Sequence, residues 1–69
     1  MELNQPPGFS ITERRVGVLV AAGFTNAVIA NRLLLTVQAV EWSVAKLCRA
    51  LEAESREELE TRLGELSAG

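Results

Sequence analysis

Side chains able to contact a partner recur at helical spacing between residues 38 and 49 of this chain of 69 residues. With about 100° per residue, and with the direction of Val40 taken as inward, one stripe of side chains points outward. This stripe comprises Gln38, Trp42, Ala45 and Arg49, and it is flanked by Glu41 and Lys46. The spacing therefore predicts an exposed face that mixes amide, aromatic, methyl and charged groups.

The chemistry of this face suits the edges and backbone of a nucleic acid. The amide of Gln38 can pair with adenine, and the ring of Trp42 can press on a thymine methyl group or a sugar. Lys46 and Arg49 can contact phosphate, which positions a protein without reading sequence. Glu41 accepts a hydrogen bond only from cytosine and otherwise repels the phosphate backbone, so it narrows the choice of base at the expense of affinity.

Each of these residues also has a simpler interpretation. Trp42 can fold back over a neighbouring helix, and the two cations can belong to an ordinary solvated surface. Thr25 and Thr36 are first of all helix N-caps, although a phosphate can share the free N–H groups at such helix ends. Asn26 is either a capping-turn residue or a base reader.

Two helices are expected before this face. Ser10 and Glu13 have the spacing of a capping box, so a first helix is predicted over about residues 11–22. Gly23 supplies the left-handed stop at its end. Thr25 then caps a short second helix, which we expect over residues 26–34 because its apolar residues fall on one side.

Two further helices carry the face and close the chain. Thr36 caps a third helix, predicted over residues 37–52, whose apolar side consists of Val40, Val44, Leu47 and Leu51. Ser55 and Glu58 repeat the capping-box spacing and open a fourth helix, predicted over residues 56–66. Its apolar stripe is made of Leu59, Leu63 and Leu66, and it needs a partner to cover it.

The predicted fold class is an all-α, compact cluster of four helices, because the short second helix excludes a long parallel bundle. Residues 1–8 hold both prolines, so they are interpreted as a flexible leader or linker, and residues 9–69 as a single domain. A short helix, a turn and a longer helix match the helix-turn-helix geometry, whose second helix enters the major groove of DNA.

Composition argues against catalysis and metal binding. The chain has no His, no Tyr and one Cys, so it lacks a disulfide, a zinc cluster and the usual general base. We therefore expect no enzyme, no metal and no cofactor. Every apolar run is interrupted by Arg, Asn or Glu, which predicts no membrane segment, and the lone Cys48 indicates a reducing cytoplasm.

Charge is distributed unevenly along the chain. The net charge of −2 argues at first against a nucleic-acid partner, since such proteins carry basic surfaces. However, residues 9–51 hold five Arg or Lys against two Glu, a net +3, whereas residues 52–69 hold two Arg against six Glu, a net −4. Five of the seven cations therefore accompany the first three predicted helices.

A set of segments resembles one known family. They are Glu13-Arg14-Arg15-Val16, Val20-Ala21-Ala22-Gly23-Phe24-Thr25-Asn26, Ile29-Ala30, Leu33, Thr36, Val40-Glu41-Trp42, Leu51, Arg56 and Glu58-Leu59. Together they resemble the LuxR-type helix-turn-helix domain, and are most similar to those of large ATP-binding LuxR-like regulators of actinobacteria. The resemblance implies a DNA-binding domain of a bacterial transcription regulator, with the third helix in the major groove.

The resemblance also implies partners. It predicts a homodimer formed through the last helix, with Leu59, Leu63 and Leu66 as contacts, sometimes helped by the first helix. The alternative is that this stripe completes the core of the single chain. Both can hold at once, with Leu59 directed inward and Leu66 at an interface. RNA polymerase is a further candidate partner of such a regulator. The chain departs from the family where Ala27 and Ala50 replace frequent lysines, where Ala39 and Ser43 replace Thr and His, and where Gly17 replaces a common leucine.

These departures leave two functions open. The first is sequence-specific binding of duplex DNA. The second is a protein-interaction module that has kept the helix-turn-helix fold but lost DNA binding, with Trp42 as the anchor of the contact.

Overall fold

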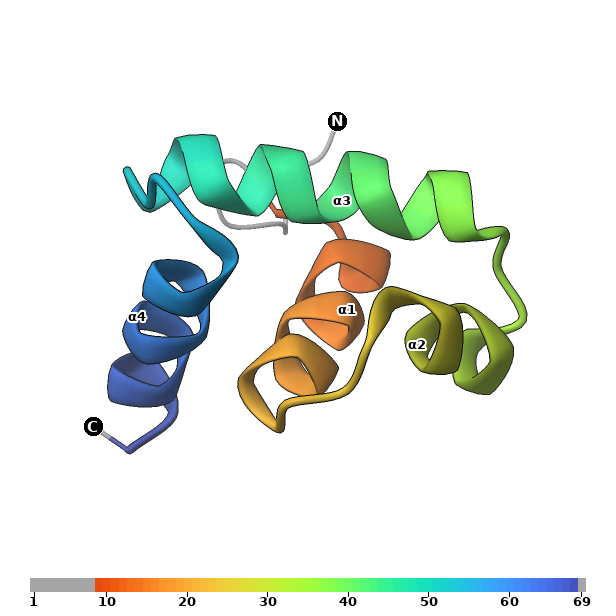
Figure 1. The fold of residues 1–69 in the computed structure, drawn as a ribbon, viewed down its shortest axis with the longest axis horizontal. Helices are drawn as coiled ribbons and strands as arrows, with labels where there is room; N and C mark the ends of the chain where they lie inside the picture. Colours follow the sequence, from red (N-terminus) through yellow and green to blue (C-terminus); the bar gives the residue numbers. More distant parts are fainter. Residues whose placement is uncertain (1–8, 69) are drawn as a thin grey trace.

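The computed structural model describes residues 9–68 and contains four α-helices (Figure 1). They are α1 (Ile11–Ala21), α2 (Asn26–Leu33), α3 (Val37–Ala50) and α4 (Arg56–Ala68). No strand occurs in this range, so the all-α prediction is confirmed. The predicted leader, residues 1–8, lies outside the described residues.

The first three helices begin where their capping residues predict. Ser10 Oγ accepts a hydrogen bond from the Glu13 N–H at 3.1 Å, and Glu13 Oε1 accepts one from the Ser10 N–H at 2.8 Å. Thr25 and Thr36 each accept from the N–H three residues further on, at 3.3 and 3.0 Å. These bonds satisfy backbone donors that an α-helix leaves free at its start.

The start of α4 differs in one detail from the predicted capping box. Ser55 Oγ accepts from the Glu58 N–H at 3.1 Å, as expected. The carboxylate of Glu58, however, accepts from the N–H of Glu54 at 2.8 Å instead of that of Ser55. This backbone hydrogen bond, together with the Arg62 guanidinium, lowers the pKa of Glu58.

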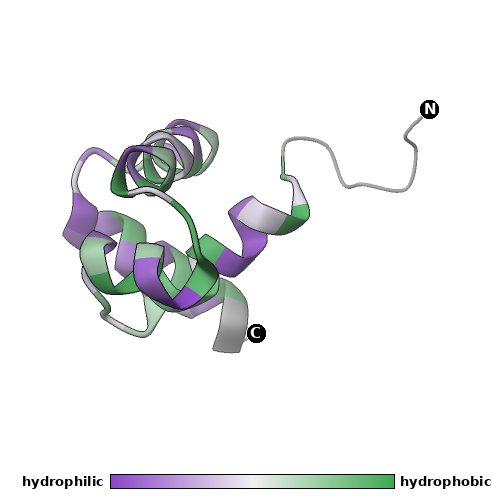
Figure 2. Cartoon of the chain, turned by 90° about the vertical axis from the view of Figure 1, so that its right-hand side faces the viewer, coloured by the Kyte–Doolittle hydropathy of each residue, from purple (hydrophilic) through white to green (hydrophobic). Residues whose placement is uncertain are grey.

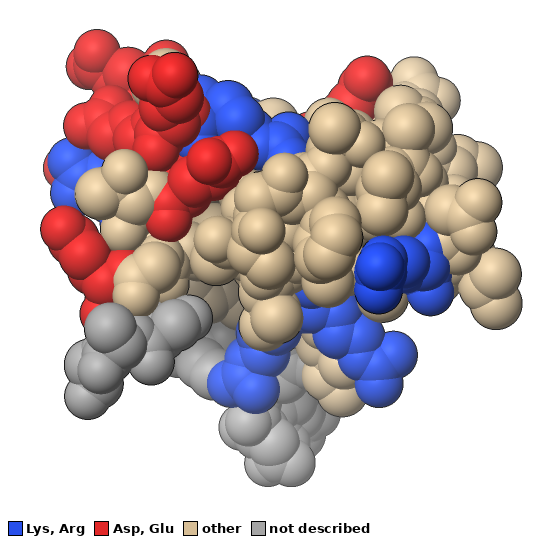
Figure 3. Space-filling model, turned by 60° about the horizontal axis from the view of Figure 1, so that its bottom comes forward, with Lys and Arg blue, Asp and Glu red and all other residues tan. Residues whose placement is uncertain are grey.

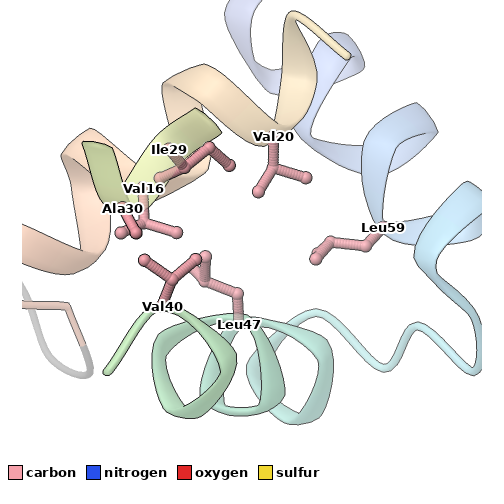
Figure 4. Packing of buried hydrophobic residues seen from close by; sticks show 7 residues of the cluster. All are labelled: Val16, Val20, Ile29, Ala30, Val40, Leu47 and Leu59. Carbon is pink, nitrogen blue, oxygen red and sulfur yellow. The ribbon is translucent and has the colours of Figure 1, made fainter. Parts of the chain in front are cut away.

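Seven apolar side chains form the buried core, to which all four helices contribute. They are Val16, Val20, Ile29, Ala30, Val40, Leu47 and Leu59. Figure 4 shows them directed toward one interior region, with Leu59 reaching in from α4. Apolar and polar stretches alternate along the helices (Figure 2), as expected of helices that each bury one side.

Three left-handed residues end the first three helices. Gly23, after α1, has a φ of 93°, which glycine adopts without steric cost. Leu34, at the end of α2, has a φ of 59°. Glu52, just after α3, has a φ of 57°. A side chain in this conformation costs about 1 kcal/mol or more. α3 ends at Ala50, two residues before its predicted end, and α4 ends at Ala68, two residues after its predicted end. α1 and α2 each end one residue earlier than predicted.

Arg56 fastens the start of α4 to the turn between α1 and α2. Its Nη1 donates to Asn26 Oδ1 at 2.6 Å, and its Nη2 donates to the Phe24 carbonyl oxygen at 2.7 Å. Its Nε lies 3.4 Å from a carboxylate oxygen of Glu60. One guanidinium group therefore joins α4 to the segment that contains Phe24 and Asn26.

Gly17 is a buried position at which a larger residue fits. A β-carbon there would lie 3.6 Å from Leu63 Cδ2 and 3.7 Å from Leu47 Cδ1, which are ordinary contact distances. Alanine also favours the middle of a helix over glycine by about 1 kcal/mol. We therefore expect Gly17→Ala to raise the free energy of unfolding by about 1 kcal/mol, measured by urea denaturation.

A matched control for this variant is Gly64→Ala, on α4. A β-carbon at Gly64 would meet no atom within 4 Å, so this variant gains helix propensity but no packing. A Gly17→Ala protein less stable than the unaltered chain would contradict the prediction.

Candidate nucleic-acid interface

The outer face of α3 is open to solvent along its whole length. In Figure 1, α3 lies across one side of the molecule, with the other three helices beneath it. Val40 and Leu47 are buried on its inner side, which fixes the rotation of the helix about its axis. The predicted outward residues are all exposed, namely Gln38, Glu41, Trp42, Ala45, Lys46 and Arg49.

Trp42 lies in the middle of this outer face, and 66% of its surface is exposed. Of the two interpretations open from the sequence, packing over a neighbouring helix is therefore wrong in this structure. An indole ring is seldom left bare without a partner to cover it. Trp42 is thus a strong candidate for a contact residue.

Lys46 is held toward α1 by an ion pair. Its Nζ lies 3.3 Å from Glu13 Oε2. The backbone hydrogen bond from Ser10 is the main reason why the pKa of Glu13 is lowered, and Lys46 lowers it further. Glu13 therefore stays ionised at neutral pH and remains paired with the lysine.

The other cations of the first three helices differ in their availability. Arg49 is exposed near the end of α3 and pairs with no carboxylate among the described residues. Arg14 and Arg15 are exposed on the first turns of α1. Arg32 lies over the Phe24 ring at 4.4 Å from its centroid, so part of its surface is already in contact.

Acidic and basic groups occupy different parts of the surface. Figure 3 views the molecule from the side opposite α3 and shows most acidic side chains gathered on the left, the side of α4. Lys and Arg side chains lie at the lower centre and right of the same view, apart from those mixed among the acids. In this view the acidic side chains therefore gather on the side of α4, whereas the exposed Glu41 belongs to the outer face of α3.

The three polar candidates near the helix starts have different environments. Thr25 and Thr36 are exposed, and each hydroxyl already accepts a hydrogen bond as an N-cap. Asn26 is half-buried and accepts the 2.6 Å hydrogen bond from Arg56. Sequence reasoning missed this role, since the two residues are thirty positions apart and no local spacing links them.

The three leucines predicted to form a dimer contact lie at different depths. Leu59 is fully buried in the core, Leu63 is half-buried against it, and Leu66 is 64% exposed. Leu63 and Leu66 line an open apolar groove with Gly17 and Val18 of α1. Only the outer part of the stripe is therefore available to a second molecule.

No helix within residues 9–68 combines the length and the apolar character that a membrane span requires. Within the same residues, no group of three or more His, Cys, Asp or Glu side chains is placed to hold a metal ion. Comparisons with family models, with curated proteins and with solved structures find no match to this chain.

Proposed function

We propose that this chain binds duplex DNA through the outer face of α3, as a LuxR-type helix-turn-helix domain of a bacterial transcription regulator. The observation that carries the proposal is a short α2, a turn of three residues and a longer α3 whose outer face is uncovered. With 14 residues, α3 is about 21 Å long, enough to lie across the major groove. The resemblance of the sequence to that family supports the same assignment.

The residues of the outer face divide between two tasks in this proposal. Gln38, Trp42 and Ala45 face the bases, where an amide pairs with adenine and apolar groups meet thymine methyls. Arg49 contacts phosphate near the end of α3. Phosphates also approach the starts of α2 and α3, where Thr25 and Thr36 leave other N–H groups free.

We also propose that two copies associate through α4, as the family resemblance implies. Leu66 and Val18 are each 64% exposed and lie on the rim of one apolar groove, which supports a contact there. We further propose that the DNA-bound dimer contacts RNA polymerase.

Trp42 provides a direct test, because it is the single tryptophan of the chain. Duplex DNA of mixed sequence, titrated at low salt, is expected to change its fluorescence emission. The affinity should fall steeply as salt is added, since neutralised phosphates release counterions. Unchanged emission, together with unchanged NMR signals from residues 36–49, would overturn the proposal.

Arg49→Ala should weaken this binding about tenfold, because a hydrogen-bonded charge contact is lost. It should also reduce the slope of log affinity against log salt by about 0.9, the value of one phosphate contact. Arg62→Ala, an exposed arginine of α4, is the matched control and should leave both quantities unchanged. Equal effects of the two variants would mean that only net charge matters.

A second candidate function is a protein-interaction module, and the exposed apolar residues favour it. Besides Trp42, Leu34 is 90% exposed and Val37 is 43% exposed around the turn before α3. A large exposed apolar group is more typical of a protein contact than of a phosphate contact. The DNA titration decides between the two, because a module of this kind leaves residues 36–49 unaffected by DNA.

A further inference from the structure

The two oxygens of the Glu13 carboxylate interact with two different partners. Its Oε1 accepts the Ser10 N–H at 2.8 Å, which completes the capping of α1. Its Oε2 lies 3.3 Å from the ammonium of Lys46 on α3. The side chain of Glu13 is only 14% exposed, whereas that of Lys46 is 49% exposed. The carboxylate is therefore the fixed member of the pair, and the lysine is the member able to move.

The negative charge of Glu13 is not needed for the cap. A capping box also forms with glutamine, whose amide oxygen accepts the same hydrogen bond. Beyond the cap, this charge also attracts Lys46, which lies on the flank of the outer face. Apart from Arg49, Lys46 is the sole cation of α3.

We propose that Glu13 limits the DNA affinity of α3 by holding the Lys46 ammonium on the α1 flank and away from phosphate. This inference rests on the proposed function, since it concerns the strength of the same contact. A phosphate group must compete with a fixed carboxylate for the lysine. In the unaltered protein Lys46 then adds little to DNA affinity, and Arg49 supplies the phosphate contact of α3.

The size of the effect follows from the exposure of the pair. Partly exposed ion pairs change an equilibrium by about fivefold at most. The flexible stem of lysine lets its ammonium swing to a phosphate once the carboxylate charge is removed. Glu13→Gln should therefore raise DNA affinity about twofold to fivefold at low salt. It should also steepen the salt dependence by about 0.9, the slope of one added phosphate contact.

The experiment measures the affinity of the full chain for a mixed-sequence duplex at several salt concentrations, with Glu13→Gln beside the unaltered protein. Glu58→Gln is the matched control. Glu58 also accepts a backbone N–H at 2.8 Å, and it pairs with Arg62 at 3.1 Å, but on α4. The Glu58→Gln variant therefore removes the same charge far from Lys46. The slope of log affinity against log salt should be the same for this variant as for the unaltered protein.

Lys46→Gln provides a second, independent measurement on an exposed residue whose replacement does not threaten the fold. In the unaltered background it should change the salt slope by much less than 0.9. In the Glu13→Gln background it should remove the gained contact completely. This dependence on Glu13 is a readout that loss of a helix cap does not produce.

Four outcomes are informative in different ways. A full loss of one contact in Lys46→Gln alone would overturn the inference, because Lys46 would already be on phosphate. Equal gains in Glu13→Gln and Glu58→Gln would also overturn it, in favour of net charge. If no variant binds DNA even at low salt, the proposed function itself fails. If the unaltered chain binds and Glu13→Gln has no effect, only the inference fails.

Discussion

A Leu59→Ala variant is expected to lose about 3 kcal/mol of its free energy of unfolding and to be largely unfolded at moderate temperature. Leu59 is fully buried and is the α4 member of the core. Truncation of a buried leucine costs about 2–5 kcal/mol, depending on how far the cavity collapses. A domain this small has only about 3–5 kcal/mol in total. Urea denaturation followed by circular dichroism measures the loss.

Leu66→Ala is the matched control on the same helix. Leu66 is 64% exposed, so its truncation should leave the stability of the single chain within about 0.5 kcal/mol of the original. It should instead weaken self-association, measured by sedimentation at increasing protein concentration. If Leu59→Ala were as mild as Leu66→Ala, Leu59 would not belong to the core in solution.

An Arg56→Ala variant is expected to lose about 2–3 kcal/mol of stability. The guanidinium group donates to Asn26 Oδ1 and to the Phe24 carbonyl oxygen, and both bonds are partly buried. Hydrogen bonds that involve a charged group contribute about 1.5–3 kcal/mol, and their loss leaves acceptors without a partner. Thermal denaturation measures the change, and hydrogen exchange should show α4 opening before the other helices.

Two further variants separate the geometry of Arg56 from its charge. Arg56→Lys keeps the charge but has one nitrogen where two are needed, so it should remain nearly as unstable as Arg56→Ala. Asn26→Ala should cost less in the Arg56→Ala background than in the unaltered protein, since the shared bond is then already absent. Full rescue by lysine would contradict the assigned geometry.

Local sequence signals were sufficient to predict the four helices. Each N-cap hydroxyl accepts the hydrogen bond that its spacing implies, and apolar periodicity placed the inner side of α3 correctly. The end of α3 was misjudged for a physical reason. A glycine in the left-handed conformation is a common signal for the end of a helix, but here Glu52 adopts that conformation. The end of α3 contains neither glycine nor proline, so the sequence carries no local signal for the end of this helix.

The candidate site was predictable only where it depends on helical rotation. The exposure of the outer face follows from the rotation of an α-helix by about 100° per residue. The ion pairs and hydrogen bonds of the charged residues do not follow from this rotation. The ion pair of Lys46 with Glu13 and the bonds of Arg56 to Asn26 join residues far apart in the chain. Such contacts arise from the packing of whole helices, which a single sequence does not specify locally.

The left-handed residues on either side of α3 have a consequence for how occupancy of the outer face can be detected. The left-handed backbone conformations of Leu34 and Glu52 each lower the free energy of unfolding relative to a glycine at the same position. A ligand that binds only the folded state adds stability by mass action, about 2.7 kcal/mol at one hundred times its dissociation constant. The melting temperature of this domain should therefore rise measurably when a ligand occupies the outer face.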